Sequence, residues 1–134
     1  MNIKKFIKAG ESETVEFKAG FNKETIISLV AFANTKGGKV IVGVDRKGRV
    51  SGVEVSPETV QRYLNEAKFA TYPQIMPSVD EHEINGKTVL TFEISEYPVK
   101  PISFKNRYYK RVKNSKHLLS LDEIVDLQQQ SLSI

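Results

Sequence analysis

The feature that most constrains the fold of this chain is a short, wholly apolar run near residue 40. Val40-Ile41-Val42-Gly43-Val44 contains no polar side chain, and a strand without alternation is typical of the centre of a sheet covered on both faces. It follows Gly37-Gly38, a pair that can end a helix and supply the left-handed backbone of a tight turn into a strand. The sequence therefore predicts a central strand preceded by a packed helix.

Three helices are predicted, each from a capping residue followed by apolar residues at helical spacing. The first has apolar residues on most of its surface and should be largely buried. The last begins with a capping box, in which Ser120 and Glu123 satisfy each other's backbone N–H groups. The polar residues 128–134 are expected to begin a linker to a further region. The three helices are expected from Lys23 to about Asn34, from Pro57 to before Pro73, and after Ser120.

Strand patterns dominate the rest of the chain. A short strand is expected at 50–53. Asn85-Gly86 is a strong two-residue turn signal and should join 80–84 to 87–95 in a hairpin. A second hairpin is expected to join 101–104 to 108–112 through Lys105-Asn106-Arg107, at a sheet edge. The sequence predicts an α+β (mixed α/β) fold, with a single mixed sheet, about three helices and one domain over residues 1–134.

The amino-acid composition limits the cellular compartments in which the protein is expected. The chain has no cysteine, so neither a disulfide nor a cysteine-bound zinc ion can stabilise it, and a cytoplasmic location is the simplest expectation. The first residues lack the apolar run of a signal peptide, and no apolar stretch approaches the length of a membrane span. We therefore expect no membrane partner.

Positive charge is concentrated in one segment. The residues from Lys100 to Lys116 include seven lysines and arginines and no acid, while the whole chain has a net charge of +4, so the remainder sums to −3. Cations interleaved with aromatic rings suit the phosphates and bases of DNA or RNA. The alternative is a solvated hairpin whose lysines only discourage strand pairing. The predicted nucleic-acid contacts are Lys105, Arg107, Tyr108, Tyr109, Lys110, Arg111, Lys113 and Lys116.

Three motifs, which follow one another along the chain, resemble those of a known protein family. They are Glu11-Ser12-Glu13-Thr14-Val15-Glu16-Phe17-Lys18, Ala31-Phe32-Ala33-Asn34-Thr35-Lys36-Gly37-Gly38 and Ile41-Val42-Gly43-Val44-Asp45, followed by Arg107-Tyr108-Tyr109-Lys110-Arg111-Val112. From about Glu11 to Leu132 the chain resembles the Schlafen AlbA-type domain, formerly labelled a divergent AAA domain. The resemblance implies an AlbA-like core. Bacterial and archaeal members resemble modules of transcriptional regulators, which implies such a role here.

The eukaryotic Schlafen relatives imply a second function. Their acidic residues form a metal-dependent ribonuclease site for structured RNA such as tRNA, and by position these residues correspond to Glu11, Glu16 and Asp45. Three converging carboxylates would repel each other unless a hard cation such as Mg²⁺ or Mn²⁺ lay between them, and such an ion could activate water. The alternative from the residues alone is that Glu16 lies on the solvated face of a strand and Asp45 opens a turn.

Three functional hypotheses follow. The first is a nucleic-acid-binding module of a regulator that contacts the phosphate backbone through the basic hairpin. The second is a metal-dependent endoribonuclease with Glu11, Glu16 and Asp45 as catalytic ligands. The third is a dimerisation module, because two-lobed relatives imply that one copy leaves a surface uncovered and because hairpin strands offer edges for a homodimer. Gly37-Gly38-Lys39 does not indicate nucleotide hydrolysis, since a P-loop runs from strand to helix and this segment runs the other way.

Overall fold

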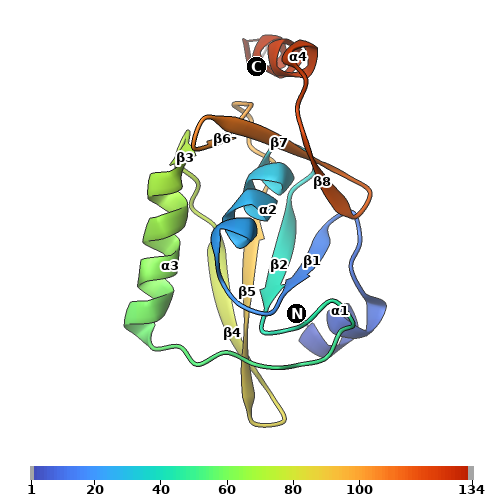
Figure 1. The fold of residues 1–134 in the computed structure, drawn as a ribbon, viewed down its shortest axis with the longest axis vertical. Coiled ribbons are helices and arrows are strands. Elements are labelled where there is room, and N and C mark those ends of the chain that lie inside the picture. The colour runs from blue at the N-terminus through green and yellow to red at the C-terminus, as the bar shows by residue number, and fades with distance from the viewer. Residues whose placement is uncertain (1, 133–134) are drawn as a thin grey trace.

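The computed structural model describes residues 2–132, in which two four-stranded sheets pack with four helices (Figure 1). The α+β class is therefore confirmed, whereas the single sheet and the count of about three helices are wrong. The helices are α1 (Ile3–Ala9), α2 (Lys23–Ala33), α3 (Pro57–Ala70) and α4 (Leu121–Leu132). The strands are β1 (Val15–Lys18), β2 (Gly38–Val42), β3 (Thr71–Tyr72), β4 (Ser78–Ile84), β5 (Lys87–Ile94), β6 (Ser103–Phe104), β7 (Arg107–Val112) and β8 (Ser115–Leu118).

The first sheet has the strand order β1-β2-β5-β4. β1 and β2 are parallel, and the other neighbours are antiparallel. The central position predicted for the apolar run is confirmed, because Val40, Ile41 and Val42 on β2 have no exposed surface. α2 and α3 contribute to the apolar cluster on one face of this sheet, and α1 contributes to the cluster on the other face. The strand ends at Val42 because Gly43, with a φ of 106°, turns the chain away.

α2 lies between the two sheets and is the most buried helix of the described chain. Every residue from Thr25 to Ala33 is buried, which confirms the prediction for this helix. Two glycines end it for different reasons. Gly37 has a φ of 74°, a conformation that favours glycine, whereas a Cβ at Gly38 would lie 2.6 Å from the Phe32 ring. The first glycine is therefore required by the turn and the second by close packing.

The second sheet has the order β3-β6-β7-β8, and the Asn34 side chain connects it to the end of α2. The Asn34 amide, directly after α2, donates to the carbonyl oxygens of Ile102 and Tyr109 at 2.9 Å each. Its Oδ1 atom accepts the Ile102 N–H at 2.6 Å. Asn34 is 5% exposed, so these bonds connect the buried end of the helix to the sheet that carries the basic segment.

Several local expectations need correction. The hairpin at Asn85-Gly86 is confirmed, but α1 and β8 were not anticipated. Residues 50–53 form no strand, because Ser51 and Gly52 both donate to the Gly43 carbonyl, and only an isolated Val44–Val50 bridge remains. β7 pairs on both sides, so it is not the edge strand that was expected.

The C-terminal part of the described chain is helical. The residues from Gln128 to Leu132, predicted to begin a linker, continue α4, and residues 133 and 134 lie outside the described range. The predicted capping box is confirmed, since Ser120 and Glu123 bond to each other's backbone N–H groups. No residue of α4 is buried, and the helix projects from one end of the molecule (Figure 1). None of the described helices is long and apolar enough to cross a membrane.

Candidate nucleic-acid interface

The basic segment from Lys100 to Lys116 is largely neutralised by carboxylates from other parts of the chain. Four of its seven cations form ion pairs, which leaves a charge of +3 when the four partners are counted. The pairs are Lys100–Glu96, Lys110–Glu123, Arg111–Glu16 and Lys116–Glu24. Among the described residues, the cations of this segment without a carboxylate partner are Lys105, Arg107 and Lys113.

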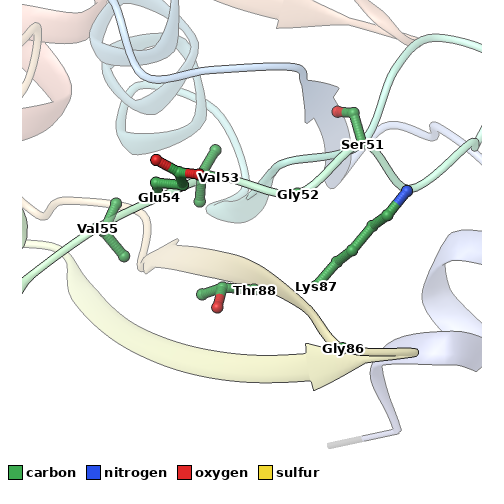
Figure 2. Close-up of a pocket in the computed structure, with 8 residues that line it drawn as sticks. All are labelled: Ser51, Gly52, Val53, Glu54, Val55, Gly86, Lys87 and Thr88. Atoms are coloured by element: carbon green, nitrogen blue, oxygen red, sulfur yellow. The ribbon is translucent and has the colours of Figure 1, made fainter.

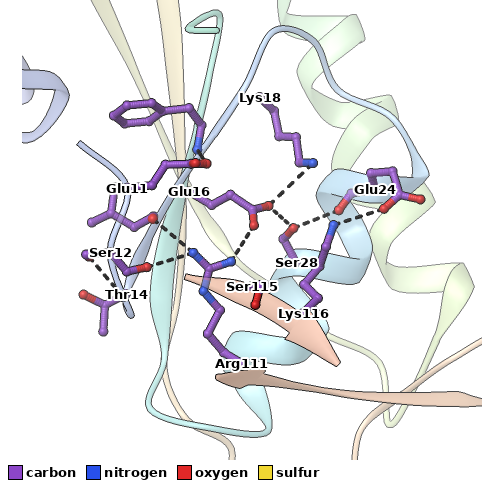
Figure 3. Close-up of polar contacts among 12 residues, drawn as sticks. Glu11, Ser12, Thr14, Glu16, Lys18, Glu24, Ser28, Arg111, Ser115 and Lys116 are labelled. Carbon is purple, nitrogen blue, oxygen red and sulfur yellow. Dashed lines mark hydrogen bonds and ion pairs between the residues drawn. The ribbon is translucent and has the colours of Figure 1, made fainter. Parts of the chain in front are cut away.

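Arg111 lies inside the protein, so the phosphate contact predicted for it is wrong. Its side chain is 0% exposed and is ion-paired with Glu16. The guanidinium also donates to the Ser12 carbonyl oxygen at 2.8 Å and lies 4.8 Å from the centre of the Phe32 ring. Figure 3 shows it pointing from β7 toward β1. Arg111 therefore joins the second sheet to the first and offers no surface to a partner.

Glu16 is the buried counterpart of Arg111. It is 6% exposed, although the alternative considered from sequence placed it on a solvated face. Burial alone would raise the pKa of this carboxyl, but hydrogen bonds from Ser28 and Arg111, with the nearby charges of Lys116 and Lys18, hold the pKa below its usual 4.5. The Lys18 ammonium is 3.7 Å away. Glu16 is thus a charged carboxylate whose neighbours already compensate it.

Glu11 and Asp45 are each engaged elsewhere. A Glu11 carboxylate oxygen accepts the Phe17 N–H at 2.9 Å. Asp45 accepts the backbone N–H groups of Lys47 and Arg49 at 2.9 Å, and the Arg49 Nε–H at 2.8 Å. Because these bonds, first of all the one from the Arg49 backbone, favour the charged carboxylate, they lower the pKa of Asp45.

The three predicted metal ligands are not brought together. Glu16 lies opposite Val40 in the parallel pair, and Asp45 follows Val40 by five residues, beyond the end of β2. No group of three or more histidine, aspartate or glutamate side chains within residues 2–132 is arranged to hold a metal ion. The charged residues around Glu16 instead form an internal ion-pair network (Figure 3).

The exposed cations of the basic segment lie at two tight turns. β6 and β7 are joined by Lys105 and Asn106, with φ angles of 46° and 67°, and Arg107 is the first residue of β7. Two successive left-handed residues are typical of a two-residue hairpin turn that matches the strand twist. Lys113, with a φ of 56°, lies in the turn before β8. Lys105 and Arg107 therefore stand together, and Lys113 lies at the other end of β7.

The two tyrosines of the segment face opposite ways. Tyr109 packs against the core cluster that contains α2. Little of its side chain is therefore accessible for the predicted contact with nucleic acid. Tyr108 is half-buried on the outer face. It lies opposite Ser103, which in turn lies opposite Tyr72. Directly opposed residues share a face of an antiparallel sheet, so Tyr108 and the 72% exposed Tyr72 lie on the same outer face.

Further cations and rings surround the β6–β7 turn. Lys23, Phe69 and Lys105 line a hollow of about 340 Å³ between the start of α2 and the end of α3. Glu66 also lines it, and its carboxylate pairs with Arg62 at 3.8 Å. Phe69 is 75% exposed, and the Lys68 ammonium lies 5.7 Å from its ring centre. We define the β6–β7 turn surface as Lys23, Lys68, Phe69, Lys105 and Arg107. Its four cations have no carboxylate partner among the described residues.

Part of this surface was missed by the sequence analysis. Phe69 falls outside the stripe formed by Val60, Leu64 and Ala67 on α3, and a large apolar residue off the buried stripe of a helix is a sign of an exposed contact. Lys23 stands in the first turn of α2, where the helix dipole disfavours a cation. Those two departures from the usual pattern could have indicated the site.

The largest hollow lies elsewhere and lacks the arrangement of a catalytic site. It has a volume of about 570 Å³ and is formed by residues 51–55 and the start of β5. Its charged side chains, Glu54 and Lys87, stand at opposite ends of it (Figure 2). The Lys87 ammonium donates to the Val50 carbonyl oxygen at 3.3 Å. These side chains do not form an acid–base pair, so the hollow carries no functional assignment.

The fold matches two solved structures at low sequence identity. One is the crystal structure of the DIP2311 protein from Corynebacterium diphtheriae, with a TM-score of 0.70 and 22% identity. The match covers 87% of this chain and 27% of that one, so the chain spans about a quarter of its length. The other is the solution structure of the N-terminal domain of a putative ATP-dependent DNA helicase RecG-related protein from Nitrosomonas europaea. Its TM-score is 0.64 at 20% identity, over 90% of this chain and 92% of that domain.

These matches define the class as an α+β domain of the same fold as those two proteins. Residues 11–120 match the family described as Schlafen, AlbA_2. The chain belongs to this family, which confirms the resemblance of its three motifs. No curated protein matches the chain significantly.

Proposed function

We propose that the domain binds the phosphate backbone of DNA or structured RNA through the β6–β7 turn surface. The observation that carries the proposal is the distribution of uncompensated charge. Lys105 and Arg107 remain unpaired and exposed, while their neighbours in sequence are neutralised by carboxylates. Lys23 and Lys68 add two more cations from separate helices. Such a group can neutralise several phosphates at once.

The backbone of the turn supports this interpretation. Lys105 adopts a left-handed conformation, which is uncommon for lysine and costs more than it would for asparagine or glycine. This conformation holds Lys105 at the tip of the hairpin, where its side chain is exposed. The same turn places the Lys105 ammonium 5.5 Å from the centre of the Phe104 ring.

An exposed ring complements the cations. Phe69 is 75% exposed and lines the same hollow as Lys105 of the β6–β7 turn. Aromatic side chains of this kind can stack on unpaired bases without reading a sequence. Contacts to phosphates and stacking together position a nucleic acid but carry little sequence information. We therefore propose a binding module with weak sequence preference.

A regulatory protein is the setting we propose for this module. The support is the motif resemblance to bacterial and archaeal regulator modules. A second support is the fold match to the N-terminal domain of a putative ATP-dependent DNA helicase RecG-related protein. In such a protein the domain would hold the nucleic acid while another region supplies selectivity. If the isolated domain enriched one sequence motif from a random DNA library, this assignment of selectivity to another region would be contradicted.

The test is the salt dependence of binding. Fluorescence anisotropy with a labelled duplex and a labelled RNA hairpin should show a slope of log affinity against log salt of roughly −3 to −4, for about four phosphates. Changing Lys105→Asn and Arg107→Gln together should flatten that slope by about two. Asparagine suits the left-handed position, so the turn should be kept.

A charge-matched control isolates the surface. Lys36→Gln with Lys113→Asn also removes two exposed cations, of which Lys113 is at a left-handed turn position and Lys36 is paired with Glu13. This variant should keep the slope of the parent. An unchanged slope in the Lys105/Arg107 variant, or an equal loss in the control, would rule out the β6–β7 turn surface as the binding site.

A further inference from the structure

A second group of uncompensated cations lies on α1 and on the turn after β2. Lys4, Lys5 and Lys8 are exposed on a helix that contains no acidic residue. Arg46 and Lys47 are exposed on the turn. None of these five cations has a carboxylate partner among the described residues. The nearby Asp45 is already paired with Arg49.

The two segments meet around a shared hollow. Lys4, Lys8 and Lys47 line a space of about 270 Å³, whose apolar lining consists of Ile7, Val50 and Ile84. The turn lies directly against the helix, since a Cβ at Gly48 would be 3.6 Å from the Ile7 carbonyl oxygen. Lys4 and Lys8 are one helical turn apart and therefore share a face. Three ammonium groups thus border one hollow that is open to solvent.

This arrangement is unfavourable for the protein alone. Like charges four residues apart on a helix repel each other, and no carboxylate within residues 2–132 is paired with these lysines. Lys8, in the last turn, is favoured by the helix dipole, but Lys4 is not. An external anion would relieve the repulsion. Of the segments that form this surface, α1 lies outside the part of the chain that matches the Schlafen family, and the turn that carries Lys47 lies within it.

The second surface is separate from the first. α1 packs in the cluster with Phe17, Ile41 and Val89, whereas Phe104, beside the β6–β7 turn, packs in the cluster with α2 on the other face of the first sheet. Figure 1 shows α1 well away from β3 and β6. The two surfaces therefore lie on different sides of the protein, and one straight segment of nucleic acid could not contact both.

We propose that Lys4, Lys8 and Lys47 form a second phosphate-binding surface, so that one domain holds two segments of nucleic acid. This proposal rests on the proposed function for the class of ligand, but it uses different residues. The test is a bridging assay. A biotinylated duplex is immobilised, the domain is added, and capture of a second, fluorescent duplex is measured, alongside anisotropy with each short duplex alone.

Three variants, each lacking two cations, separate the outcomes. Lys4→Gln/Lys8→Gln should reduce capture by about tenfold, because two phosphate contacts are lost, and should still bind one duplex. Lys105→Asn/Arg107→Gln should also lose capture, while Lys36→Gln/Lys113→Asn should keep it. Circular dichroism should show that all three remain folded.

The results distinguish this proposal from the proposed function. Full capture by the Lys4/Lys8 variant, or a parent that binds one duplex without capturing a second, would overturn the second surface. If the Lys105/Arg107 variant binds and captures like the parent while the Lys4/Lys8 variant loses affinity for one duplex, the β6–β7 turn surface fails and the α1 surface remains as the binding site. If the parent binds neither probe, both proposals fall.

Discussion

Arg111 on β7 and Glu16 on β1 form a buried ion pair between residues that are 95 positions apart in the chain. The pair joins the two sheets, and the guanidinium also bonds the backbone that enters β1. A residue from the most basic stretch of the sequence is therefore part of the core. Positive charge in that stretch therefore includes a cation with an internal, structural role.

Replacing Arg111 with alanine should strongly destabilise the protein. The change leaves the Glu16 carboxylate buried without its main partner, so we expect the free energy of unfolding to fall by about 3–5 kcal/mol. Urea unfolding would measure it. The double change Glu16→Leu/Arg111→Met should be less destabilised than the single change, because neither member of the buried pair is left as an unpaired charge. An alanine variant of parental stability that binds nucleic acid less well would instead place Arg111 on the surface.

Stability should fall on acidification partly because of Glu16. Its folded pKa lies below the 4.5 of the unfolded chain, so the folded state binds fewer protons. Its contribution is complete above pH 4.5 and is lost as the pH falls through the lowered folded pKa. Urea unfolding between pH 7 and pH 3 should therefore show a weaker pH dependence in Glu16→Gln than in the parent. The exposed Glu54→Gln variant should follow the parent, and equal slopes in all three proteins would contradict this assignment.

Changing Asp45 to asparagine should lower the melting temperature slightly. The carboxylate accepts two backbone N–H groups and pairs with Arg49, so the variant loses a favourable charge and relieves no repulsion. Melts in chelator and in manganese would measure this effect, with a tRNA cleavage assay in parallel. A higher melting point in chelator, together with manganese-dependent cleavage by the parent alone, would show that Glu11, Glu16 and Asp45 do converge in solution.

We expect the domain to form a homodimer through α4. Leu121, Val125 and Leu132 form an apolar stripe on this helix and are 75%, 41% and 86% exposed, and burying such a stripe against a second copy is favourable. The edge strand β4 carries Asp80, Glu81 and Glu83, which disfavour edge pairing. Sedimentation should show a dimer that Leu121→Gln/Val125→Gln disrupts. A parent that stays monomeric at high concentration would contradict the expectation.

Local signals in the sequence were sufficient to predict most of the helices and strands. Asn22, Ser56 and Ser120 cap helices as predicted, and Asn85-Gly86 forms its hairpin, because these effects depend on neighbours within a few residues. The second sheet could not be predicted as fully. Its β6–β7 hairpin was predicted, but β3 has two residues, too few to show a hydrophobic period.

The candidate site was predicted only in part, for a similar reason. Lys105 and Arg107 remain surface cations, but Arg111 and Lys110 are paired with Glu16 and Glu123, partners from distant segments. Charge counted along the sequence cannot reveal which cations a folded chain neutralises, because ion pairs depend on tertiary contacts. The four uncompensated cations of the β6–β7 turn surface come from three segments, and only the fold brings them together.

The hydrogen bonds of the Asn34 amide can form only late in the synthesis of the chain. Its partners, Ile102 and Tyr109, follow it by 68 and 75 residues, so a growing chain makes α2 long before these bonds can form. Until β7 emerges from the ribosome, the end of α2 must keep its polar groups in water, and Glu16 has no arginine to pair with. Contacts over such long separations form slowly. The first hundred residues should therefore remain exposed to proteases and chaperones until the basic hairpin closes over them.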